Sequence, residues 1–142
     1  CKQSEIDSYK RKISGPLMDR IDMQINLSRV EFSELKTKEK GESSAAIRER
    51  VVKARLLQQE RLEALGMHCN AQMGRSEVVK YCQLDAAAQN VMERYFNMLN
   101  LSARSHDRIL KVARTIADLA GSENIEAVHL AEAIQLRTSV RP

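Results

Sequence analysis

The chain has 142 residues, of which 43% are hydrophobic, 30% are charged and only 4% are aromatic, with no tryptophan. This balance is typical of a folded globular domain, and the shortage of aromatic residues favours a helical core of aliphatic side chains over a β-sandwich or barrel. The formal net charge of +4 permits an anionic partner without requiring one. No apolar run approaches the roughly 20 residues of a transmembrane helix, so we expect no membrane partner.

The cysteines indicate the compartment. Cys1, Cys69 and Cys82 are odd in number and far apart, which argues against a disulfide framework and favours a reducing, cytoplasmic environment. His68, Cys69 and Cys82 match no common zinc-ligand spacing, so we expect inert thiols and no metal site. A lone Cys1 cannot hold a metal, and whether it belongs to an upstream metal cluster stays open. Because the chain begins at Cys1 and carries no signal peptide, we expect it to be a piece of a longer protein.

The first segment predicts a short helix over residues 4–14. Ser4 is a good N-cap, and the apolar residues that follow recur near one face. Gly15 is expected to end this helix, and Pro16 suits the first position of a new turn.

Residues 21–27 alternate between apolar and polar side chains, which predicts a half-buried strand. One strand has no partner in this chain, so we interpret residues 1–28 as the C-terminal remnant of an α/β core. We expect residues 1–42 to be mobile or to pair with a second copy. Residues 29–42 are polar and rich in lysine and glutamate, and they predict a linker around a turn at 32–35.

From residue 43 the pattern predicts a helical domain over 43–142. Ser43 or Ser44 begins the first helix, and Ser76, Asp85 and Ser102 are expected to cap later ones. Gly66 and Gly121 are expected stop signals. The five predicted helices cover 43–65, 76–82, 85–99, 102–120 and about 126–137.

Apolar periodicity selects a core face on each main helix. The first helix should bury Ile47, Val51, Ala54, Leu56 or Leu57, and Ala64. Ala88, Val91, Met92, Tyr95 and Phe96 are the core candidates of the third helix. The fourth should bury Ile109, Ala113, Ile116, Ala117 and Ala120.

The opposite face of the helix over 102–120 carries a basic stripe. Arg104 lies near the helix N-terminus, where the dipole and the free N–H groups favour phosphate. We interpret Lys111 and Arg114 as solvated surface residues, whereas Arg108 fits either a surface or a ligand-binding role. Neither His106 nor His129 has an acidic or serine partner at nucleophile spacing, so we expect no catalytic histidine.

Four motifs in order resemble one family: "ISGPLMDRID", "GESSAAIRERVVKAR", "CNAQM" and "LSARSHDRILKVARTIADLAG". They are similar to the C-terminal part of the magnesium-chelatase-related AAA+ ATPases of the ComM/YifB type. The resemblance implies a mainly α fold, in which a helical AAA+ lid of about five helices follows the truncated end of the AAA+ α/β core. It also implies ATP and Mg²⁺ as cofactors of the longer parent. No Walker A motif occurs here, so we expect no bound cofactor and no activity for this chain alone.

The resemblance also implies roles for individual arginines. Arg20 matches the arginine finger that reaches the ATP of a neighbouring subunit, where an always-charged forked donor stabilises the γ-phosphoryl group. From spacing alone, a surface pair with Asp19 or Asp22 is the commoner outcome. Arg104 matches the sensor 2 arginine, and Arg108 is a further candidate for nucleotide binding.

Three functions fit the sequence. The family implies a homo-oligomeric ring, expected to be a hexamer, that couples ATP hydrolysis to DNA remodelling such as branch migration or helicase activity in natural transformation and recombination. The alternatives are a stand-alone helical DNA-binding module, and an ATPase subunit that helps a chelatase insert a metal into a tetrapyrrole. Few aromatics and interspersed glutamates weigh against the DNA-binding module. The substrate and the ring size stay open.

Overall fold

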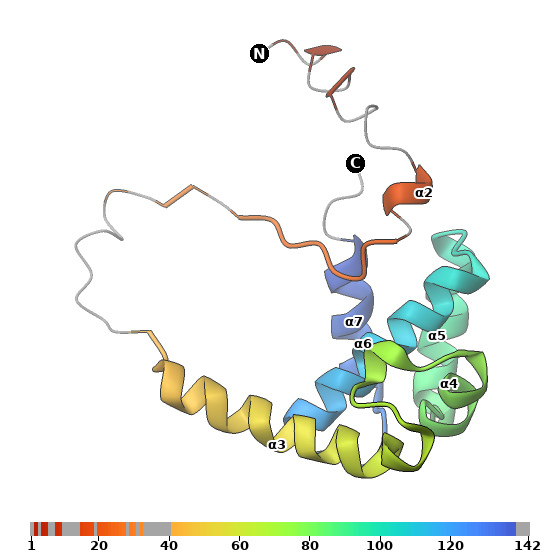
Figure 1. Ribbon diagram of the computed structural model, residues 1–142. Helices are drawn as coiled ribbons and strands as arrows, with labels where there is room; N and C mark the ends of the chain where they lie inside the picture. The colour runs from red at the N-terminus through yellow and green to blue at the C-terminus, as the bar shows by residue number, and fades with distance from the viewer. Residues whose placement is uncertain are drawn as a thin grey trace.

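The computed structural model describes residues 2, 4–5, 8–9, 15–18, 20–27, 29–30, 32 and 41–138. From residue 41 onward the chain forms five α-helices, as predicted (Figure 1). They are α3 (Ser44–Leu62), α4 (Arg75–Tyr81), α5 (Ala86–Met98), α6 (Ala103–Ala120) and α7 (Ala127–Thr138). In the described part of the chain no strand forms, and one isolated parallel bridge joins Leu84 to Ile125. No helix that is described is long and apolar enough to cross a membrane.

Local capping chemistry sets most helix ends. At three of the predicted N-caps the side-chain oxygen accepts a hydrogen bond from the backbone N–H three positions on, at 3.3 Å for Ser43, 2.7 Å for Asp85 and 3.2 Å for Ser102. Gly66 and Gly121 adopt left-handed φ angles of +67° and +69°. Both stop signals are therefore confirmed, with a 3₁₀ turn at Glu63–Leu65 closing the first helix.

The cap predicted for α4 is wrong. Gly74, not Ser76, is the N-cap, and its N–H donates to the Glu77 carboxylate at 2.7 Å. The Ser76 hydroxyl donates to the same carboxylate at 2.7 Å. These two hydrogen bonds, that of Ser76 first, lower the pKa of Glu77. The helix starts one residue early because a carboxylate inside its first turn satisfies the N–H of Gly74.

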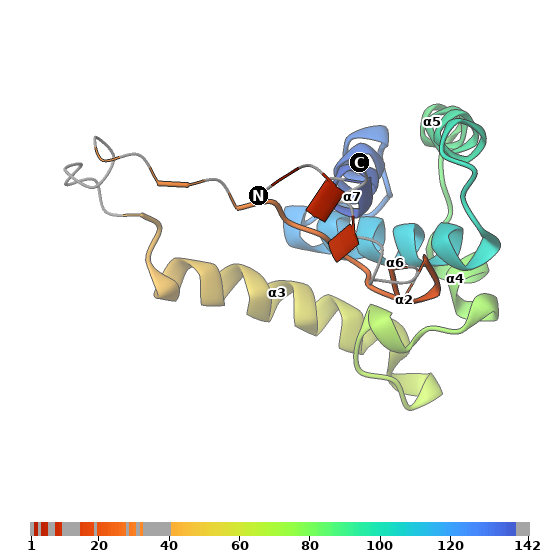
Figure 2. The same ribbon diagram turned by 90° about the horizontal axis from the view of Figure 1, so that it is seen from above.

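The central element of the domain is α6. It contacts α3, α4, α7 and the 3₁₀ turn Asn70–Gln72 (η3), and α5 packs on α7 (Figures 1 and 2). The core is aliphatic, as the composition predicts, and its largest fully buried apolar side chains are Leu62, Met73, Val78, Ile109, Ile125, Leu130 and Ile134. Burying such side chains stabilises a domain by roughly 1.5–3 kcal/mol each.

The predicted core face of α3 is only partly correct. Ala54 is buried, as predicted, and so are Gln58 and Leu62. Ile47 and Val51 continue the same helical face but remain 43% and 45% exposed. The physical reason is that the N-terminal half of α3 projects beyond the other helices (Figure 2). The remaining candidates Leu56, Leu57 and Ala64 are exposed as well.

The predicted strand at residues 21–27 is wrong. These residues have no strand partner in the described chain, and the segment passes along the C-terminal end of α7 instead (Figure 1). There the N–H of Gln24 donates to the carbonyl of Leu136 at 2.6 Å. A new turn does form at Gly15–Met18 (α2).

Some predictions for the first 42 residues concern positions that the structure does not describe. The predicted helix over 4–14 is helical at 4–5 and 8–9, and its other positions lie outside the described residues. Phe32 lies in a turn, but the rest of the turn predicted at 32–35 lies outside them, as do Cys1 and Asp19.

Candidate anion-binding site

A cleft of about 510 Å³ opens between α4, α6 and the segment around Asp22. Its lining residues are Asp22, Ala71, Met73, Gly74, Arg75, Val78, Arg104, Asp107, Arg108 and Lys111. Four of these side chains are basic and two are acidic, so the cleft has an excess of positive charge. A cleft lined by one sign of charge attracts ligands of the opposite sign.

Arg104 differs from the other arginines of this cleft in its side-chain contacts. It is exposed, and none of the described residues forms an ion pair or hydrogen bond with its guanidinium. It is the second residue of α6, two positions after the N-cap Ser102. Backbone N–H groups at this end of a helix lack intrahelical partners, so guanidinium and backbone can meet the same anion.

Arg108, one turn further along α6, is engaged within the chain. Its Nη1 donates to the backbone carbonyl of Arg20 at 2.9 Å, and the same group forms an ion pair with Asp22. The Arg108 side chain is 28% exposed. Its donors therefore face the segment at 20–22 as well as the cleft.

The remaining two basic side chains of the cleft are Arg75 on α4 and Lys111 on α6, and no sequence pattern predicts that they lie together. Arg75, at the start of α4, forms an ion pair with Asp107 on α6. Lys111 is half-buried, and its Nζ donates to the carbonyl of Ala71 at 3.3 Å. Lys111 was predicted to be a solvated surface residue, and it lies at the surface of the cleft with part of its side chain covered. Arg75 was missed because a basic residue beside a glycine has no distinctive signal.

The Arg20 side chain lies apart from the cleft. It is exposed, and no described residue pairs with its guanidinium. The surface pair with Asp22 that spacing favours does not form, because Asp22 pairs with Arg108 instead. The structure thus brings together Arg104, Arg108 and the backbone of Arg20, while the Arg20 side chain pairs with none of the described residues.

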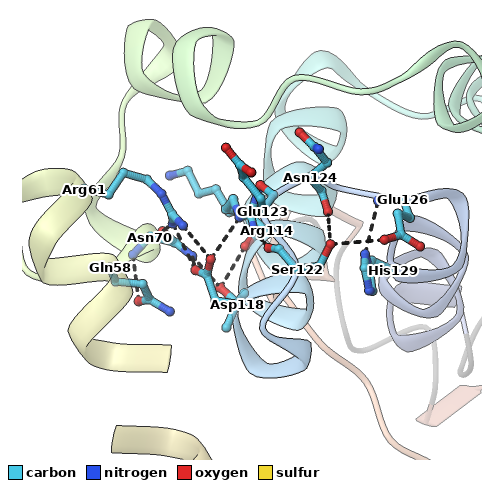
Figure 3. Close-up of polar contacts among 12 residues, drawn as sticks. Gln58, Arg61, Asn70, Arg114, Asp118, Ser122, Glu123, Asn124, Glu126 and His129 are labelled. Atoms are coloured by element: carbon cyan, nitrogen blue, oxygen red, sulfur yellow. Dashed lines mark hydrogen bonds and ion pairs between the residues drawn. The ribbon is translucent and has the colours of Figure 1, made fainter. Parts of the chain in front are cut away.

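A buried polar network joins α3, η3 and α6 (Figure 3). The fully buried Asp118 carboxylate accepts two hydrogen bonds from Arg61, at 2.6 and 3.0 Å. It also accepts one from Arg114 Nε at 3.0 Å and one from Asn70 Nδ2 at 2.8 Å. The backbone N–H of Asn70 donates to Gln58 at 3.2 Å. The hydrogen bonds with Asp118 raise the pKa of Arg61 above its ordinary value.

The interpretation of Arg114 as a solvated residue is therefore wrong. The side chain is 4% exposed, and its two terminal nitrogens donate to the carbonyls of Ser122 and Glu123, at 2.7 Å each. Its burial is tolerated because each of its three side-chain nitrogens meets an acceptor. Arg114 holds the loop between α6 and α7 in place.

His129, His106 and Cys82 take part in contacts within the helical domain. Buried His129 accepts a hydrogen bond from the N–H of Glu126 at 3.1 Å at the start of α7, and His106 meets the edge of Phe96 at a centroid distance of 6.1 Å. Burial raises the pKa of the Cys82 thiol to about 11. Within the described ranges no three His, Cys, Asp or Glu side chains gather into a metal-binding group.

Comparison with known proteins identifies the family. Residues 41–137 match the family described as the C-terminal region of magnesium chelatase subunit ChlI, and residues 1–35 match the family of magnesium chelatase subunit ChlI itself. The chain belongs to the magnesium chelatase family. This confirms the resemblance and its mainly helical, lid-type fold.

Relatives within the magnesium chelatase family place the chain on the ComM/YifB branch. It is 40% identical over 138 residues to competence protein ComM of Haemophilus influenzae, which covers 96% of this chain and 26% of that protein. Identity to the uncharacterized protein YifB of Escherichia coli is 36%, with the same coverage. Identity to an uncharacterized protein of Mycobacterium tuberculosis is 30% over 137 residues, covering 96% and 27%. The chain thus spans about a quarter of the length of the curated relatives it matches.

Proposed function

We propose that this chain is the lid-bearing C-terminal part of an AAA+ ATPase that couples ATP hydrolysis to DNA remodelling. The observation that carries the proposal is the basic cleft headed by Arg104 at the N-terminus of α6. Membership of the magnesium chelatase family and 40% identity to a competence protein support it. The remodelling would be branch migration or unwinding in natural transformation and recombination.

The cleft suits the phosphates of ATP. Arg104 offers a planar fork of donors to phosphate oxygens, and Arg75 and Lys111 add positive charge nearby. The cleft does not suit Mg²⁺, because Asp22 and Asp107 are each paired with an arginine. The Mg²⁺ of the ATPase would therefore depend on the nucleotide phosphates and on groups outside this chain.

Arg20 would act on a different nucleotide from the one bound in its own cleft. Its side chain is exposed and free of described partners, as an arginine that serves a neighbouring subunit must be. The functional unit would then be a homo-oligomeric ring, a hexamer by family resemblance, in the cytoplasm. Each interface would combine the nucleotide of one subunit with the finger of the next.

The chain by itself is expected neither to hydrolyse ATP nor to bind it tightly, because no phosphate-cradling Gly-rich loop occurs in its sequence. Titration with a fluorescent ATP analogue measures this directly, and we expect a Kd well above the micromolar range. Micromolar binding by the 142 residues alone would mean that the cleft is a complete nucleotide site, contrary to its proposed role as a lid.

The longer polypeptide that contains this chain is expected to hydrolyse ATP faster when branched or single-stranded DNA is added. Arg104→Ala should weaken nucleotide binding, because it removes the free guanidinium of the cleft, whereas Arg94→Ala on the exposed face of α5 should not. Steady-state ATP turnover with and without DNA is the measurement. Turnover that DNA leaves unchanged, but that a chelatase partner and a tetrapyrrole stimulate, would favour the second candidate, a metal-chelatase ATPase subunit, which the family description itself suggests.

A further inference from the structure

The segment that carries Arg20 is fastened to the lid by α6. Arg108 Nη1 donates to the carbonyl of Arg20 at 2.9 Å and pairs with the carboxylate of Asp22. A single guanidinium thus holds a backbone group and a side chain two residues apart. Arginine suits this task because its donors are fixed in one plane.

The helix α7 supplies a second fastening. Arg137 is buried, and its two terminal nitrogens donate to the carbonyl of Ile21 at 2.8 Å and to the hydroxyl of Ser105 at 3.0 Å. Three residues further along the segment, the N–H of Gln24 donates to Leu136 at 2.6 Å. Residues 20–24 thus contact both α6 and α7.

The fastening and the cleft share one helix. Arg104 and Arg108 are four residues apart on α6 and therefore lie on the same side of it. Ser105, between them, receives the hydrogen bond from Arg137. A movement of α6 toward or away from a nucleotide held by Arg104 would therefore displace the backbone of Arg20.

We propose that Arg108 is a positioning residue: it fastens the finger segment to the lid, so that closure of the lid on one nucleotide moves the Arg20 that serves the neighbouring subunit. The effect on the neighbouring subunit rests on the proposed function. The contacts that fasten the segment to α6 belong to this chain alone and do not depend on it. It assigns Arg108 a role different from nucleotide binding, because its guanidinium already meets Arg20 and Asp22.

The fastening is tested in the 142-residue chain by hydrogen exchange at the Gln24 amide. Arg108→Ala should accelerate this exchange at least about tenfold, since a released segment opens more often. Asp22→Ala should do the same, and because it leaves the lid sequence intact, it excludes an effect of lid unfolding. Arg94→Ala, which removes an exposed arginine of α5, is the matched control and should change nothing. Wild-type exchange in both Arg108→Ala and Asp22→Ala would overturn the proposal.

The effect of the fastening on catalysis is tested in the longer ATPase. Arg108→Ala should lower kcat at least about tenfold and leave nucleotide affinity within about twofold, and Arg108→Lys should recover part of kcat. Weakened nucleotide binding with unchanged kcat would make Arg108 a nucleotide ligand and overturn the positioning role. If the wild-type protein shows no ATP turnover, the proposed function fails, whereas the hydrogen-exchange result still decides the fastening.

Discussion

Replacing Asp118 with alanine is expected to lower the free energy of unfolding of this chain by about 3–5 kcal/mol. The carboxylate is fully buried and accepts hydrogen bonds from Arg61, Arg114 and Asn70. Its loss leaves the buried guanidinium of Arg114 without its charge partner and removes the link between α3 and α6. A domain of this size is stable by only about 5–15 kcal/mol in total, so the variant would lose much of its stability.

Urea unfolding followed by circular dichroism measures this difference. Glu93→Ala is the matched control, because Glu93 is an exposed carboxylate on α5 and its removal should change the free energy of unfolding by no more than about 0.5 kcal/mol. A loss below about 1 kcal/mol for Asp118→Ala would show that the network contributes little and that apolar packing alone joins α3 to α6.

Helix ends were predictable because their determinants are local. Ser43, Asp85 and Ser102 each satisfy an N–H only three residues away, and Gly66 and Gly121 adopt backbone angles that disfavour other residues. Such short-range chemistry can be inferred from the neighbouring residues alone.

Burial was harder to predict, because periodicity indicates a face of a helix and not its depth. Val51 and Ala54 share one face of α3, yet only Ala54 meets α6. Arg114 lies among basic neighbours, but the Asp118 carboxylate and two backbone carbonyls make its burial favourable. The alternation at 21–27 predicted a strand that forms no strand pairing in this chain.

The candidate site was predictable only in part. Arg104 was assigned from its place at a helix N-terminus and from family resemblance, and the cleft around it agrees with an anion-binding role. That Arg75 lines the same cleft depends on how α4 packs against α6, which no local pattern encodes. The engagement of Arg108 by Arg20 and Asp22 joins residues more than 80 positions apart.

In the longer ATPase, Arg20→Ala is expected to lower ATP turnover by about 10³-fold or more and to leave nucleotide binding nearly unchanged. The finger would stabilise charge on the neighbour's γ-phosphoryl group in the transition state, so it contributes little to ground-state binding. The fold should be unaffected, because the side chain is exposed and packs against no described residue. Nucleotide titration beside steady-state kinetics separates the two effects.

The most direct test of a finger that acts between subunits is the ATP turnover of mixed rings. Arg20→Ala subunits, which have an intact nucleotide site, are combined with subunits whose Walker A lysine is replaced. Each variant alone should be inactive, but mixed rings contain interfaces with one intact site and one intact finger. We predict that mixing restores a measurable fraction of wild-type turnover. Wild-type turnover by Arg20→Ala alone, or no recovery in rings shown to be mixed, would contradict the assignment of Arg20 as the finger.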